Sequence, residues 1–202
     1  MQITAEDHTA IAAEIRAAEQ RTSGQLVCVL AHASSGYATV PILWASVLAL
    51  ALPWPLIYLS PWSVERIFLA QLALFIAAGL VFSWTPLRFW LVPRRVQRAR
   101  AHRAALEQFF LRHVGHTAKR TGVLIFVSLA ERYAHIVADE GIAAKVPNAE
   151  WQAAIDALTG HMRDGRIAAG FIAAIERCGA VLAQHAPPDG SPNVLPDRLY
   201  VM

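Results

Sequence analysis

The stretches VPILWASVLALALPWPLIYL, at residues 40–59, and IFLAQLALFIAAGLVFSWTPL, at residues 67–87, decide the fold of this 202-residue chain. The only charged residues within or between them are the neighbours Glu65 and Arg66. As a helix, each stretch is about 30 Å long, which matches the hydrocarbon core of a bilayer. The alternative is a pair of central helices in a soluble bundle, but such helices normally keep a polar stripe. The sequence therefore predicts a transmembrane helical hairpin over residues 38–92.

The composition supports membrane insertion and argues against several classes of function. Charged residues make up 16% of the chain, whereas typical soluble domains contain about 25%. The two spans contain no ionisable side chain, which argues against a transporter with an ion path at mid-membrane. The cysteines, Cys28 and Cys178, lie in apolar runs and show neither a disulfide framework nor metal-ligand spacing. No P-loop, nucleophile elbow, dinucleotide fingerprint or zinc-protease motif occurs.

The charge distribution predicts the orientation in the membrane. Nine of the 18 Lys and Arg residues lie between Arg88 and Arg120, directly after the second apolar stretch. The positive-inside rule places this block in the cytoplasm, and a hairpin returns the chain to the side that it left. Residues 1–24 lack the pattern of a signal peptide, so the first span should act as an uncleaved anchor. We expect a multi-pass protein of the inner (plasma) membrane with both termini in the cytoplasm.

An arginine-rich segment predicts an amphipathic helix that leaves the membrane at residues 94–118. Its first half carries the arginines that we expect to contact lipid headgroups, namely Arg94, Arg95, Arg98, Arg100 and Arg103. Anionic headgroups of the adjacent bilayer are the expected partner, at about 1 kcal/mol for each basic residue near the surface. Nucleic acid is the competing interpretation of an arginine-rich helix. Because membrane topology already accounts for these charges, we predict no nucleic-acid partner.

Three short apolar runs predict strands at residues 25–30, 123–129 and 133–138. The hairpin brings all three to the same side of the membrane, where a single sheet can include them. The helices that would cover this sheet are predicted at residues 4–21, 94–118, 148–163 and 166–185. The expected fold class is α+β, a small helix-covered β-sheet domain interrupted by a two-helix transmembrane hairpin.

This interpretation divides the chain into four parts. Residues 1–37 supply the first helix and strand of the sheet domain, and residues 38–92 form the hairpin. Residues 93–187 contain the basic juxtamembrane helix and the remainder of the sheet domain. Residues 188–202 are rich in proline and glycine, and we expect them to form a flexible tail.

Strand and turn patterns in the second half carry a family resemblance. The patterns are RTGVLIFVSLAER at 120–132, IVADEGI at 136–142, Trp151 and GFIAAI at 170–175. Together they resemble the TPM-domain (TPM phosphatase-like) family, in the membrane-anchored subgroup that carries an inserted transmembrane hairpin. The resemblance implies a small sheet layered with helices and often tethered to a membrane. It also implies the phosphatase activity and calcium binding proposed for some members. A divalent cation is therefore implied by the resemblance alone, and by no other feature of the sequence.

The candidate binding residues are Asp139, Glu140 and Gly141, at the end of the third predicted strand. Carboxylate oxygens are ligands for hard cations, and the alternative is a solvated turn. Many family members place an acidic pair before the glycine that opens the central strand, where this chain has the basic run 119–121. Two cations oppose the binding of a third, so no catalytic residue is transferred from the family and the metal site stays unassigned.

A pair of histidines is the other candidate metal site. His113 and His116 have the i, i+3 spacing that can bring two imidazoles to one metal ion. No cysteine or acid accompanies them locally, and the alternative is solvation at the end of a helix. No cofactor is predicted from these residues.

Two functions remain open at this point. The first is a non-catalytic binding or assembly module that holds an unidentified protein partner at the membrane. The second is a metal-assisted, phosphatase-like hydrolase, which needs a converging set of carboxylates.

Overall fold

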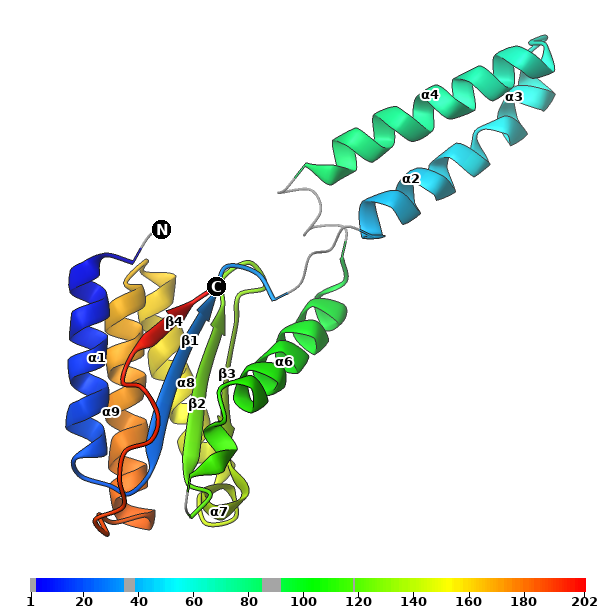
Figure 1. Cartoon of the computed structure of the whole chain (residues 1–202). Helices are drawn as coiled ribbons and strands as arrows, with labels where there is room; N and C mark the ends of the chain where they lie inside the picture. The colour runs from blue at the N-terminus through cyan, green and yellow to red at the C-terminus, as the bar shows by residue number, and fades with distance from the viewer. Residues whose placement is uncertain (1–2, 35–38, 85–91, 118) are drawn as a thin grey trace. The chain divides into compact units, whose positions relative to one another are not determined.

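The chain forms two compact units, which we name the α+β unit and the hairpin unit. The structure is a computed structural model that describes residues 3–34, 39–84, 92–117 and 119–202 (Figure 1). The α+β unit comprises Met1–Ser34 and Arg100–Met202, and the hairpin unit comprises Ser35–Ala99. The hairpin unit is therefore an insertion in the sequence of the α+β unit.

A four-stranded mixed sheet forms the centre of the α+β unit (Figure 1). The strands, in the order β3-β2-β1-β4, are β3 (Tyr133–Ala138), β2 (Gly122–Ser128), β1 (Gln25–Ala31) and β4 (Leu199–Val201). Strand β1 is parallel to β2 and to β4, and β2 is antiparallel to β3. In register, Gln25 is opposite Gly122 and Cys28 is opposite Leu199. The predicted α+β class is confirmed.

The sheet separates two apolar cores. The helices of this unit are α1 (Ala5–Glu19), α6 (Arg94–Leu111, which begins in the hairpin unit), α7 (Glu140–Ala143), α8 (Asn148–Arg163) and α9 (Ile167–His185). Helices α1, α8 and α9 cover one face, where Leu26, Cys28 and Leu30 point (Figure 1). The C-terminal half of α6 packs on the other face, against Val27 and Val29. Burial on both faces explains why β1 and β2 are continuous apolar runs.

Several elements of the α+β unit begin where local sequence signals place them. Thr4 and Asp7 form the predicted capping box of α1, in which the Asp7 amide donates to the Thr4 hydroxyl at 3.2 Å. Helix α8 begins at Asn148, directly after Pro147, as predicted. Helix α9 crosses α1 at Gly179, where an added Cβ would lie 2.8 Å from the Cβ of Ala18.

Two expectations about the α+β unit need correction. The tail was expected to lack stable structure, but residues 199–201 form the edge strand β4. The helix predicted at 94–118 ends at Leu111, because His113 adopts a left-handed backbone conformation with φ 54°. A short 3₁₀ turn, η1 (Val114–His116), follows it.

The hairpin unit contains α2 (Thr39–Ala51), α3 (Pro53–Leu59) and α4 (Val64–Ser83). The break between α2 and α3 falls at Leu52, directly before Pro53, because proline cannot continue the hydrogen-bond ladder of a helix. Small residues are buried where α2 meets α4, while most large apolar side chains of the unit are exposed. The expected ends of the spans at 35–38 and 85–91 lie outside the described residues.

Candidate functional site

The three candidate binding residues lie in the turn that follows β3. Asp139 is the N-cap of α7, and its Oδ1 accepts a hydrogen bond from the Glu140 amide at 2.8 Å. Asp139 is 6% exposed, and its Oδ2 has no hydrogen-bond partner among the described residues. Glu140 is exposed. A Cβ on Gly141 would lie 2.3 Å from the carbonyl oxygen of Lys119, so only glycine fits this close approach.

Arg120 determines what this turn can bind. Its Nη1 donates to Glu140 Oε2 at 2.7 Å, and its Nε lies 3.8 Å from Asp139 Oδ1. The guanidinium therefore occupies the position between the two carboxylates that a cation would need. Within the described part of the chain, no three His, Cys, Asp or Glu residues are grouped so that they could hold a metal ion. These residues do not fit the divalent cation that the family resemblance implies.

The paired histidines do not supply a fuller ligand set. The ring centroids of His113 and His116 are 4.9 Å apart, across the start of the 3₁₀ turn. They do not share the face of one continuous helix, as the sequence had predicted, because α6 ends before His113. Their role as metal ligands stays a prediction without a third ligand in the described residues.

A buried carboxylate that sequence reasoning had missed lies at the C-terminal ends of β1 and β2, the end of these strands opposite to Asp139. Glu131, in the connection between β2 and β3, is 7% exposed. Its Oε1 accepts hydrogen bonds from the Ser34 hydroxyl at 2.7 Å and from the Ser34 amide at 3.1 Å. Its Oε2 accepts from the Ser128 hydroxyl. The cluster holds together the ends of β1 and β2, at the residue where the chain leaves the α+β unit.

A further polar cluster lies between α6 and β3. The Tyr133 hydroxyl is 3.4 Å from His102 Nδ1, and the His102 and His135 rings are 4.8 Å apart. Burial lowers the pKa of His135, and the nearby His102 lowers it further. This cluster contains two aromatic bases and a phenol but no carboxylate, so it lacks the acid that a hydrolytic metal site needs.

The arginine-rich helix presents positive charge without counter-charge. Arg94, Arg95, Arg98 and Arg103 are exposed, and none of them forms an ion pair with another described residue. Arg100 is half-buried and makes a further interaction within the protein. Glu107 is the only acid on α6. The first half of α6 is therefore suited to bind anions.

The hairpin unit is apolar on its outer surface. Segments Thr39–Leu59 and Val64–Ser83 are both long and apolar enough to cross a membrane. Exposed side chains include Leu50, Trp54, Tyr58 and Phe68. Helix α9 is also long and apolar enough by composition, but half of its most apolar segment is buried in the α+β unit. The hairpin is the region whose apolar surface is left uncovered.

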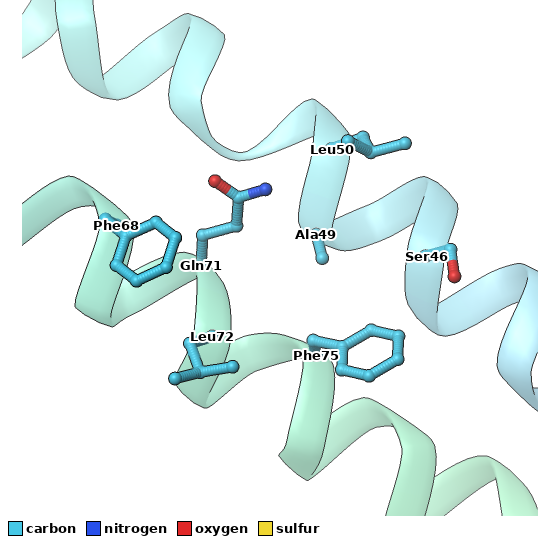
Figure 2. Close-up of a pocket in the computed structure, with 7 residues that line it drawn as sticks. All are labelled: Ser46, Ala49, Leu50, Phe68, Gln71, Leu72 and Phe75. Carbon is cyan, nitrogen blue, oxygen red and sulfur yellow. The ribbon is translucent and has the colours of Figure 1, made fainter.

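A groove runs between α2 and α4 in the hairpin unit (Figure 2). It has a volume of about 270 Å³ and is lined by Ser46, Ala49, Leu50, Phe68, Gln71, Leu72 and Phe75. The side chain of Gln71 extends from α4 toward α2 (Figure 2). Sequence reasoning had not singled out this residue, although it is the one carboxamide within α2–α4.

Comparisons with known proteins agree with this architecture. The family model of the TPM domain matches residues 86–181, which confirms the predicted resemblance over that part of the chain. The chain is similar to the NMR structure of the BA42 protein from the psychrophilic bacterium Bizionia argentinensis sp. nov.. That similarity has 19% sequence identity and a TM-score of 0.64, and it covers 100% of this chain and 97% of the other. At this identity the similarity shows the fold alone. No curated protein matches the chain.

Proposed function

We propose that this chain, whose residues 86–181 match the TPM domain, is a membrane-anchored binding or assembly module with its α+β unit in the cytoplasm. The observation that carries the proposal is the uncovered apolar surface of α2 and α4, followed in sequence by the arginines of α6. In water such a surface would be an aggregation liability, whereas in a bilayer it is the expected exterior of a hairpin.

The unpaired arginines support the proposed orientation and the contact with lipid. They follow the second span within the distance over which basic residues control topology. An anionic headgroup supplies the counter-charge that Arg94, Arg95 and Arg98 do not find among the described residues. The same three side chains therefore serve as the cytoplasmic anchor and as the headgroup contact.

The chemistry of the acidic turn supports a non-catalytic role. A metal-assisted phosphatase needs several carboxylates that converge on free space, with the metal as their counter-charge. Here Arg120 already pairs with both Asp139 and Glu140. The family name alone does not supply the missing ligands, so binding and assembly fit these residues better than hydrolysis.

One observation favours the phosphatase alternative. The unpartnered Oδ2 of Asp139 is buried, and buried polar atoms normally have a partner. Turnover of a phosphate monoester by the full chain, with Mg²⁺ or Ca²⁺ and with EDTA, tests this alternative. We expect no metal-dependent turnover. Turnover that requires metal and is lost in Asp139→Asn, but not in the exposed control Asp156→Asn, would replace the binding-module proposal.

Membrane insertion and orientation are tested in cells. We expect the full chain to resist extraction by alkaline carbonate. A reporter that functions only in the cytoplasm should be active when it is fused at the C-terminus, and one that functions only in the periplasm should be inactive. The triple change of Arg94, Arg95 and Arg98 to Gln should produce a mixed orientation. The matched control changes Arg163, Arg166 and Arg177 to Gln; these residues are far from the spans in sequence, and the control should keep a single orientation. Carbonate-extractable wild-type chain, or an active periplasmic reporter on it, contradicts the proposal.

A further inference from the structure

Among the described residues of its apolar stretches, the hairpin has one carboxamide, and that side chain has no hydrogen-bond partner. Gln71 is the eighth residue of the 20-residue helix α4, well inside the apolar segment. It makes no hydrogen bond with any other described residue. Its carboxamide has two donor hydrogens and an acceptor oxygen, and lipid tails offer no partner to either.

The surroundings of Gln71 explain why the partner does not come from the same hairpin. The residues that face it across the groove are Ala49 and Leu50, which have no polar side-chain atoms (Figure 2). The hydroxyl in the lining belongs to Ser46, which donates to the carbonyl oxygen of Ile42 at 2.9 Å and forms no hydrogen bond with Gln71. The polar group therefore faces a groove that is open on one side and holds no partner for it.

A second copy of this chain supplies the matching group. A two-fold axis places a residue near the axis opposite the same residue of the partner. Because a carboxamide both donates and accepts, two Gln71 side chains can exchange a pair of hydrogen bonds across such an axis. Interhelical bonds of this kind stabilise associations between membrane helices, where apolar side chains alone give no hydrophobic driving force.

We propose that two hairpins associate in the bilayer through the groove between α2 and α4, with Gln71 of one copy hydrogen-bonded to Gln71 of the other. The rim residues Phe68, Leu72 and Phe75 pack around this contact and exclude lipid from it. The inference rests on the proposed membrane insertion. It adds self-association as the way in which the module assembles.

The test uses the full chain reconstituted into liposomes at a series of protein-to-lipid ratios, with dimers counted by single-molecule photobleaching. We expect the wild-type chain to form a dimer. The dissociation constant of this dimer should rise about 10-fold in Gln71→Leu, which replaces the carboxamide by an apolar side chain of similar size. Gln71→Asn keeps the amide and should recover part of the loss. Ser46→Ala is the matched control and should change the constant less than about twofold, because its hydroxyl is bonded within its own helix.

The outcomes separate this inference from the proposed function. Wild-type chain that resists carbonate extraction but stays monomeric at every ratio overturns self-association and leaves the membrane anchor standing. The same holds for a dimer that Gln71→Leu does not weaken, and for a monomer that crosslinks through position 71 to a different membrane protein. Failure of the chain to insert overturns both proposals together.

Discussion

Helices α4 and α9 have similar length and composition but lie in opposite environments. Both are long and apolar enough to cross a membrane, yet half of the most apolar segment of α9 is buried, against 6% for α4. The charged residues Glu176 and Arg177 lie in the middle of α9, on its exposed side. Helix α4 has charges only at Glu65 and Arg66, in its first turn. The position of charges along a helix, more than its mean apolarity, therefore distinguishes a core helix from a candidate membrane span.

The largest difference between the two helices should appear when a phenylalanine is removed from each. Phe171 on α9 is 0% exposed, whereas Phe75 on α4 is 38% exposed. Phe171→Ala leaves a cavity and should lower the free energy of unfolding of the α+β unit by about 3–5 kcal/mol. Phe75→Ala should leave that quantity unchanged. Amide hydrogen exchange of β1 and β2 in the full chain measures this free energy in both variants. Equal protection in the two variants would contradict the expected difference between α9 and α4.

Adding a charge tests the same comparison in the other direction. Ala73→Arg places a charge at the centre of α4, where insertion of a span costs about 2.5–3.5 kcal/mol per arginine. Ala180→Arg adds the same group to the exposed side of α9. We expect Ala73→Arg to reduce the carbonate-resistant fraction severalfold and Ala180→Arg to leave it unchanged. A fully inserted Ala73→Arg chain would mean that α4 does not face lipid.

Two glycines sharpen the comparison at a finer level. Gly179 on α9 faces Ala18 so closely that an added Cβ must move one of the helices, and Gly179→Ala should destabilise the α+β unit by about 1–3 kcal/mol. Gly79 on α4 has no atom within 4 Å of an added Cβ. Gly79→Ala should be neutral or gain up to about 1 kcal/mol of helix stability. Thermal unfolding of the purified chain distinguishes the two, and the opposite order of effects would contradict the packing described for α1 and α9.

A pH dependence separates the units further, because only the α+β unit is expected to bury ionisable groups. Burial raises the pKa of Glu19 to about 8 from an ordinary value of 4.5, and the hydrogen bond and the charge of nearby Asp197 add to this, against the hydrogen bond from the Leu26 amide. The folded chain therefore keeps a proton that the unfolded chain loses above its lower pKa.

The stability contributed by this proton is complete below about pH 4.5 and is lost as the pH rises toward 8. We expect the smallest effect here, since Glu19 is only half-buried. Glu19→Gln mimics the protonated form, so the decline in unfolding free energy between pH 5 and pH 9 should be weaker in this variant. Denaturant titrations of both proteins across that range measure the difference, and parallel profiles would show that Glu19 does not titrate as described.

The sequence was sufficient where the signal was local. Strands β1 and β2 are recognisable as apolar runs because both of their faces are covered, and Pro53 ends α2 because proline lacks the amide that would continue the helix. Strand β4 gave no such signal, because three residues are too few for a pattern and their pairing with β1 is set by the tertiary fold.

The candidate sites were less predictable for the same reason. The burial of Glu131 depends on Ser34, which is distant in sequence and is brought near only by the parallel pairing of β1 with β2. The sequence shows that the cations at 119–120 are unfavourable for binding a metal ion. The direct pairing of Arg120 with both acids is visible only in the structure. The importance of Gln71 appears only when its neighbours across the groove are known.

The pairing of β1 with β2 and β4 also orders events during synthesis. Strand β1 is made before the other strands, but its neighbour β2 follows only after the whole hairpin has been translated, and its other neighbour β4 follows only after α9. A nascent β1 therefore has two open edges while the apolar hairpin emerges from the ribosome. The sheet can close only after β4 has been made, so under the proposed membrane insertion the hairpin can reach the bilayer before the α+β unit is complete.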